Sequence, residues 1–185
     1  TTGIPTPAIT YIKTAPTQQT LEAGATPTYA GTYTASITVT DESNKKTTAS
    51  VEYTIRKAKL TVTANNNTGT YGEAASDKGV TYRGFVNGED KNALQGSLTY
   101  TFTGYIPGTG VVSSCTIVPS GLTSNNYDIK IQPGTLTVTQ REVKLTWHDF
   151  ENRTYGDNKT VTATAGNLFT GDNISVTVSG GAETA

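Results

Sequence analysis

The side chains that could do chemistry are few and well separated. His148 is the only histidine and Cys115 the only cysteine, so one chain cannot form a two-histidine metal site or an internal disulfide. Cys115 lies in the stretch VSSCTIV and shares strand parity with Val111 and Ile117. This pattern predicts an inward-facing structural thiol, because a nucleophilic cysteine would need a neighbouring base.

The carboxylates gather in turns, at Glu89–Asp90, Asp157 and Asp172. A calcium loop needs several converging oxygen ligands, and none of these turns has the dense alternation of an EF-hand. A glycosidase needs two carboxylates held across a sugar cleft, for which a thin-cored β protein offers no obvious room. We therefore expect no catalytic residue, no metal and no cofactor, and we expect that the chain is not an enzyme. A calcium site between domains stays open as an alternative.

Trp147 opens the cluster Trp-His-Asp at 147–149, which could form a sugar-binding platform. However, Trp147 continues the strand parity of Val143 and Leu145. This parity favours packing in a core or between domains over ligand binding.

Among the tyrosines, two are candidates for ligand contact. Strand alternation places Tyr33 and Tyr100 in cores, whereas Tyr82 and Tyr105 lie near turns. Tyr82 and Tyr105 are therefore the residues to test as ligand contacts, and the ligand itself is unknown from the sequence.

The composition describes an ordered chain with a thin core. Hydrophobic residues make up 34%, the net charge is −1, and β-branched threonine is abundant. Scattered lysine and arginine give no footprint for nucleic acid, and no apolar run is long enough for direct membrane insertion. The chain has no methionine, even at position 1, which suggests an internal piece of a longer protein.

Alternation of apolar and polar residues is the dominant pattern, and it predicts an all-β fold. Short strands at spacings near ten residues, with turn-forming residues between them, are typical of a sandwich. The stretch 89–95 is the best helical candidate, of one or two turns. The predicted strands are 30–40, 47–56, 57–64, 97–103, 111–118, 127–131, 135–139, 143–147, 160–164 and 174–178. The predicted turns are 65–69, 87–90, 107–110, 120–126 and 133–134.

A repeat of about 83 or 84 residues organises these strands. Thr-Tyr-Gly at 70–72 returns at 154–156, and FVNGED from Phe85 is echoed by LFTGD from Leu168. The period predicts three parts: a closing partial repeat at 1–56, a complete repeat at 57–140 and an opening partial repeat at 141–185. The junctions contain no Gly or Pro pair, which favours tandem sandwich-type repeats in an elongated, semi-rigid arrangement.

The motifs KAKLTVTANNNTGTYGE at 57–73, FVNGED at 85–90 and SNNYDIKIQPGTLTV at 124–138 resemble the MBG (mostly beta, glycine-rich) repeats of large bacterial surface proteins. AGTYTASITV at 30–39 resembles the closing half of bacterial Ig-like surface repeats, and 141–157 resembles the start of a further unit. One departure is GTGVVSSC in the middle repeat, where a GTY-type segment is expected. The resemblance implies tandem Ig-like repeats of adhesin-like proteins, extracellular at the cell surface, with no catalytic residues.

Two functional hypotheses follow. The leading one is a structural stalk or spacer segment whose partners are the neighbouring repeats of the parent chain. The alternative is an adhesive module that binds a glycan or a host matrix protein through exposed aromatics or a sheet edge. The two incomplete end repeats also suggest a head-to-tail self-contact, in which the tail of one chain completes the head of another.

Overall fold

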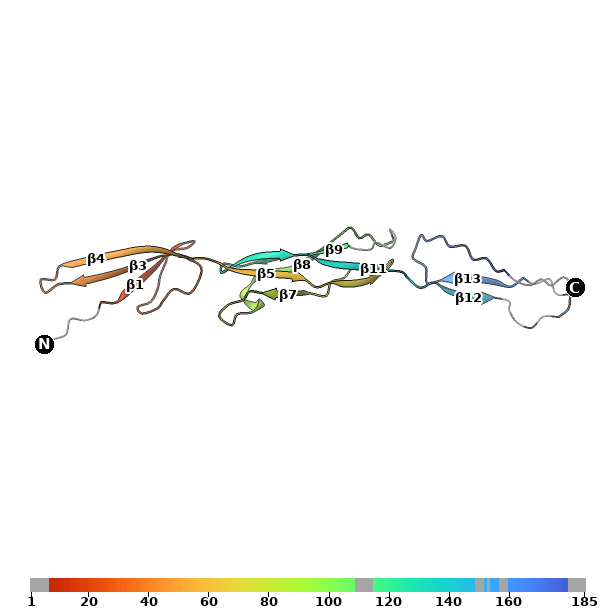
Figure 1. Ribbon diagram of the computed structural model, residues 1–185, viewed down its shortest axis with the longest axis horizontal. Coiled ribbons are helices and arrows are strands. Elements are labelled where there is room, and N and C mark those ends of the chain that lie inside the picture. Colours follow the sequence, from red (N-terminus) through yellow and green to blue (C-terminus); the bar gives the residue numbers. More distant parts are fainter. Residues whose placement is uncertain (1–6, 109–114, 149–151, 153, 157–159, 180–185) are drawn as a thin grey trace. The chain divides into compact units, whose positions relative to one another are not determined.

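The computed structural model describes residues 7–108, 115–148, 152, 154–156 and 160–179 (Figure 1). Within these residues there are thirteen strands and one short 3-10 helix, so the predicted all-β fold class is confirmed. The chain forms two compact units. Unit 1 comprises the described residues up to Val62 together with Tyr82–Leu98 and Gly121–Lys130, and unit 2 comprises Thr63–Thr81, Thr99–Ser120 and the described residues from Ile131 onward. The three-part division at residues 56 and 140 stays a prediction.

The first sheet lies in unit 1 and has the strand order β2-β1-β3-β4. β3 (Gly31–Thr40) pairs antiparallel with β4 (Lys46–Ile55) along its whole length. β1 (Ile9–Ala15) pairs with the other side of β3, and the two-residue strand β2 (Gln19–Thr20) pairs with β1. Alternation predicts β3 and β4, whereas β1 and β2 lie in a stretch for which no strand was predicted.

Tyr33 is the buried anchor of this sheet, as its parity predicts. Its hydroxyl donates to the Tyr29 carbonyl at 2.8 Å, and its ring stacks on Tyr53 with 5.8 Å between ring centroids. Farther along the strands Val39 and Val51 are exposed, at 46% and 62%. The apolar face of the sheet is therefore covered around Tyr33 and open toward the β3–β4 turn.

Two more sheets follow, of orders β10-β5-β7 and β6-β11-β9-β8. β5 (Ala58–Ala64) and β6 (Asn67–Thr70) are separated by only two residues, yet they belong to different sheets. β6 runs parallel to β11 (Gly134–Thr139), with Asn67 opposite Leu136. The remaining strands are β7 (Val80–Arg83), β8 (Gln95–Thr103), β9 (Cys115–Thr123) and β10 (Tyr127–Gln132).

Two predicted turns in this region need correction. Residues 65–69 contain the strand β6, because asparagine side chains at the switch between sheets bond to backbone groups of other segments. In the predicted turn 120–126, β9 continues to Thr123. The helical candidate at 89–95 is the single 3-10 turn Lys91–Ala93, where the Asp90 side chain accepts from the Asn92 backbone N–H at 2.8 Å.

Alternate positions of the strands supply the buried residues. In unit 1, Leu60 and Val62 of β5 are fully buried. In unit 2, a cluster of buried residues comes from the same alternation on β5, β9 and β11: Ala64, Cys115, Ile117, Leu136 and Val138. Tyr100 packs against this cluster, so its predicted core position is also confirmed.

The last sheet is a two-stranded ribbon in unit 2, made of β12 (Lys144–His148) and β13 (Thr162–Gly166). Trp147 pairs with Ala163 across the ribbon and is 50% exposed, so the described residues do not bury it in a core, and its packing between domains stays a prediction. The parity with Leu145 holds, but in the described part of unit 2 no second sheet covers that face. The predicted strand at 174–178 does not form. Val111, Asp149 and Asp157 lie outside the described residues.

Candidate functional site

The two tyrosines predicted as ligand contacts are half-buried and belong to different units. Tyr82, on β7 in unit 1, packs its ring 5.6 Å from that of Phe85, which in turn makes an edge contact with Tyr127. Tyr105, in unit 2, packs against the buried cluster, and its hydroxyl donates to the backbone carbonyl of Glu73. Each ring thus serves a contact within the chain, and the structure does not bring the two together. Their role in binding a ligand stays a prediction.

The two single reactive side chains also occupy separate places. Cys115 is buried at 3% exposure and its thiol donates to the Gly104 carbonyl at 3.4 Å, which confirms the inward-facing position. His148 is exposed on β12, where Nε2 lies 2.9 Å from Thr164 Oγ1. Among the described residues, no group of three or more His, Cys, Asp or Glu side chains could hold a metal ion.

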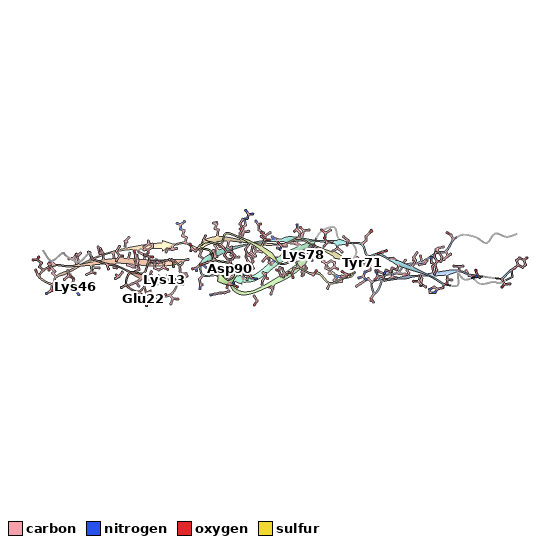
Figure 2. The ribbon with its side chains drawn as sticks, turned by 90° about the horizontal axis from the view of Figure 1, so that it is seen from below. Lys13, Glu22, Lys46, Tyr71, Lys78 and Asp90 are labelled. Atoms are coloured by element: carbon pink, nitrogen blue, oxygen red, sulfur yellow. The ribbon has the colours of Figure 1, made fainter. Side chains whose placement is uncertain are left out.

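A group of mutually bonded side chains in unit 2 lies around Tyr71, which is labelled in Figure 2. Tyr71 follows β6 directly. The Tyr71 backbone N–H donates to the Thr139 carbonyl at 2.8 Å, so the pairing with β11 continues one residue past the strand. The chain then turns, with the Glu73 N–H donating to the Thr70 carbonyl at 3.1 Å. Gly72 has φ +82° in this turn, a conformation that glycine adopts without strain.

A second turn, Phe169–Asp172, packs against the first. The Asp172 N–H donates to the Phe169 carbonyl at 3.0 Å, and the Phe169 N–H donates back to Asp172 Oδ2 at 3.1 Å. Gly171 has φ +103°. This reciprocal bonding holds the Phe169 ring and the Asp172 carboxylate at the same end of one rigid turn.

The two turns meet through a hydrogen bond and a ring contact. The Tyr71 hydroxyl donates to Asp172 Oδ1 at 2.6 Å, and the Gly108 carbonyl lies 3.2 Å from the same hydroxyl. Because the hydroxyl has one proton, the shorter, charge-assisted bond to Asp172 dominates. The Phe169 ring meets Tyr71 edge-on, with 5.9 Å between centroids and 66° between planes.

Two glycines make room for the Phe169 ring. A Cβ added at Gly72 would lie 2.6 Å from a carbon of that ring, and one at Gly108 would lie 2.1 Å from another. Both distances are shorter than any real contact, so Phe169 lies directly on the backbone at these positions. Glycine is required there for close approach as well as for backbone conformation.

The Arg141 side chain forms hydrogen bonds with residues on either side of this contact. Its Nε donates to the Tyr71 carbonyl at 2.9 Å, and its Nη1 lies 3.5 Å from Asn167 Oδ1. The Asn167 amide donates in turn to the Glu142 carbonyl at 2.9 Å. The segment between β11 and β12 is therefore bonded to the first turn and to Asn167, two residues before the second turn.

The electrostatics of Tyr71 follow from these neighbours. The hydrogen bond to Asp172 is the largest cause that raises the pKa of the Tyr71 hydroxyl. Burial and the negative charge of Asp172 raise this pKa further, whereas the positive charge of Arg141 lowers it. The hydroxyl therefore stays a proton donor at neutral pH. The arrangement pairs a donor with an acceptor to hold two turns together, and it contains no nucleophile with a base. We refer to Tyr71, Gly72, Gly108, Arg141, Phe169 and Asp172 as the Tyr71 joint.

The two motifs that form this joint are visible in the sequence, but the contact between them is not. Thr-Tyr-Gly recurs after 84 positions, and LFTGD echoes FVNGE after 83, so both are repeated motifs of the sequence. The contact joins the first copy of one motif to the second copy of the other. A period alone does not say which copies meet.

The predicted complete repeat, 57–140, contains the first turn together with the strands β6 and β11 that support it. Residues 60–137 match the family model of the MBG domain (YGX type). The resemblance predicted from the sequence is confirmed for this MBG segment, which includes Tyr71 and Gly72 followed by Glu73. Comparison with curated proteins gave no match, and comparison with solved structures gave none either. In the part of the chain that the structure describes, no helix is long and apolar enough to cross a membrane.

Proposed function

We propose that this chain is a non-catalytic structural segment of a large bacterial surface protein, acting outside the cell as a stalk or spacer. The MBG match supports a repeat domain of surface proteins. The observation that carries the spacer role is the Tyr71 joint, in which residues beyond the MBG segment are held to it by side chains. A spacer transmits position from one repeat to the next, so it needs such a joint.

The connection between β11 and β12 supports the same role. β11 ends at Thr139 and β12 begins at Lys144, so only four residues intervene, and Arg141 among them is bonded to Tyr71. A short connector with a side-chain brace has few conformations available. Thr-rich exposed positions on the strands keep such a segment hydrated.

Pulsed electron resonance distances between two spin labels test the proposal. Labels at Thr116 on β9 and Thr162 on β13, both exposed, are placed in a Cys115→Ala background. A spacer gives one narrow distance distribution, and Asp172→Asn, which weakens the joint, broadens it. Glu142→Gln is the matched control. The Glu142 backbone carbonyl accepts a bond from Asn167, but the Glu142 side chain takes no part in the joint, so this substitution leaves the distance distribution unchanged. A distribution that is broad in the unsubstituted chain would overturn the spacer role.

A second candidate function is an adhesive module for a glycan or a host matrix protein. The open part of the unit 1 sheet favours it, because Ile9, Ile37 and Val51 border a hollow of about 240 Å³ with an apolar lining. Exposed apolar surface of this kind is typical of interaction sites.

A binding array of glycans and matrix proteins tests the adhesive role, with the variants Val51→Arg, Tyr82→Ala and Tyr105→Ala compared with the unsubstituted chain. Saturable binding lost in one of these folded variants would support adhesion, and the absence of binding would leave the spacer role alone.

A further inference from the structure

The short loop between β9 and β10 in unit 1 is closed by its own serine side chain. Ser124 Oγ accepts hydrogen bonds from the Asn126 N–H at 3.1 Å and from the Tyr127 N–H at 3.2 Å. A side chain that bonds to backbone groups two and three residues ahead of it forms a compact turn. This loop, which we call the 124–126 loop, therefore holds the carbonyls of Ser124 and Asn126 and the Asn126 side chain in fixed directions.

The 124–126 loop is bonded to the connection between β4 and β5, in which only residues 56 and 57 separate the two strands. Lys57 Nζ donates to the Ser124 carbonyl at 2.8 Å. The Ala58 N–H, at the start of β5, donates to the Asn126 carbonyl at 2.9 Å. The connection that leads into the MBG segment is thus bonded to the loop by one side chain and one backbone group.

The Asn126 side chain reaches a second place, the loop that leads into β3. Asn126 Oδ1 accepts a hydrogen bond from the Ala30 N–H at 3.2 Å, and β3 begins at the next residue, Gly31. The two bonded residues are 96 positions apart in the sequence, and the bond is partly buried. Asn126 is therefore bonded to the entry of β3 through its side chain and to the entry of β5 through its carbonyl.

The peptide group between Tyr29 and Ala30 is hydrogen-bonded on both sides. Its carbonyl, which belongs to Tyr29, accepts from the Tyr33 hydroxyl at 2.8 Å, and its N–H, which belongs to Ala30, donates to Asn126. Tyr33 is the buried anchor of the first sheet. Because both bonds use one planar peptide group, a rotation that breaks one bond strains the other, and each bond polarises the other. The anchor of the first sheet is thus linked to the 124–126 loop through a single peptide.

We propose that Asn126 is the positioning residue of a second joint, which holds the first sheet of unit 1 to the 124–126 loop of the MBG segment through the Tyr29–Ala30 peptide. This inference rests on the proposed spacer role and deepens it. The Tyr71 joint bonds the MBG segment to residues that follow it, and Asn126 bonds the same segment to residues that precede it. A spacer that transmits position through a repeat needs a joint on each side of that repeat.

Hydrogen exchange of the Ala30 amide, followed by nuclear magnetic resonance, measures the Asn126 bond directly. Asn126→Ala removes the acceptor and should speed this exchange about two- to tenfold. Asn126→Asp keeps an oxygen acceptor at the same place and should restore slow exchange. Tyr33→Phe should also speed the exchange, because it frees the other side of the same peptide. Asn125→Ala, an exposed neighbour in the same loop, is the matched control and leaves the rate unchanged.

Spin-label distances within unit 1 test the positioning role. Labels at Thr47 on β4 and Lys130 on β10, both exposed, are placed in the Cys115→Ala background. The unsubstituted chain, Asn126→Asp and Asn125→Ala should each give one narrow distance distribution, and Asn126→Ala a broader one. Circular dichroism melts confirm that each variant is folded.

An Ala30 exchange rate that Asn126→Ala leaves unchanged would overturn the proposal, and so would a broad unit 1 distribution in the unsubstituted chain. Equal broadening by Asn126→Ala and Asn126→Asp would also overturn it, because the bond to the side-chain oxygen would then not be the cause. The labels at Thr116 and Thr162, which test the spacer role, lie in unit 2. A broad distribution in unit 2 alone would therefore refute the spacer role and not the Asn126 joint.

Discussion

Tyr71 and Asp172 are 101 positions apart in the chain, yet the hydroxyl of one donates a 2.6 Å hydrogen bond to the carboxylate of the other. The bond connects a turn that follows the first strands of the MBG segment to a turn beyond its last strand. Because Phe169 and Arg141 bind the same tyrosine, the three contacts form one network. Networks of this kind respond to substitution as a unit.

Asp172→Asn is expected to lower the pKa of Tyr71 toward its ordinary value of 10.0, because the hydrogen bond to the carboxylate is the largest cause of the raised value. Ultraviolet difference titration, with Tyr71→Phe as the reference that removes this one phenol, measures the shift. Tyr71→Phe and Asp172→Asn should also be strongly non-additive in denaturant unfolding. A Tyr71 titration unchanged by Asp172→Asn would show that the carboxylate does not accept the bond in solution.

Alkaline pH should destabilise the chain through tyrosines whose pKa is raised in the folded state. Burial raises the pKa of Tyr33 and of Tyr105, and the Asp172 bond raises that of Tyr71. A phenol with a raised folded-state pKa keeps its full contribution to stability below the unfolded value of 10.0, and that contribution falls as the pH rises through the folded pKa. Urea midpoints should therefore be flat up to about pH 9 and then decline. Tyr71→Phe should make the decline shallower, and stability that rises above pH 10 would contradict the assignment.

Gly72→Ala is expected to destabilise the chain more than Gly79→Ala. Both glycines have positive φ, +82° and +77°, so each substitution incurs a backbone strain of about 1–2 kcal/mol. Only at Gly72 does the new Cβ also meet the Phe169 ring, which adds about 1–3 kcal/mol of overpacking. Urea unfolding of the two variants measures the difference. Adding Phe169→Ala to Gly72→Ala should remove the excess, and equal costs at the two glycines would contradict the close ring contact.

Leu136→Ala tests the buried cluster of unit 2. Leu136 is 1% exposed on β11, so its truncation should cost about 2–5 kcal/mol in the free energy of unfolding. Leu145→Ala is the matched control, because Leu145 is 55% exposed on β12 and should cost within about 0.5 kcal/mol. Chemical denaturation monitored by circular dichroism gives both values. Similar costs for the two leucines would mean that the cluster does not form the core.

The Cys115 thiol should react slowly with an aromatic disulfide reagent in the native chain. The side chain is 3% exposed and its thiol bonds to the Gly104 carbonyl, so reaction requires the structure to open. In concentrated guanidinium chloride the reaction should be at least about a hundredfold faster. A native rate close to the denatured one would contradict the burial of Cys115.

The strands that alternation predicts are those whose inward residues are apolar, such as β5 with Leu60 and Val62. β6 was missed because Asn-Asn-Asn-Thr-Gly has the local composition of a turn. Its structure depends on partners distant in sequence: the Asn66 side chain accepts from the Thr135 N–H, and the Asn67 amide donates to the Ser76 carbonyl. Tertiary hydrogen bonds of this kind override local propensity.

The candidate site shows the same limit. The sequence marks Tyr71 and Gly72 as part of a repeated motif and Asp172 as a turn carboxylate, but only the fold places them together. Trp147 shows the opposite case: it shares its strand face with Leu145 as parity predicts, yet both side chains are at least half exposed. Parity says which residues share a face of a strand, and the presence of a covering layer decides whether that face is buried.

The parallel pairing of β6 with β11 determines how the MBG segment responds to tension. The chain enters β6 at Asn67, opposite Leu136, and leaves β11 at Thr139, opposite Thr70. A pull between Asn67 and Thr139 drives the two strands past each other along their length, so the hydrogen bonds between them are loaded together in shear rather than opened one at a time. The Tyr71–Thr139 backbone bond and the Arg141 brace extend the loaded length by two further contacts. This pairing thus acts as a clamp against stretching, and the force needed to extend the segment should depend on the direction in which it is pulled.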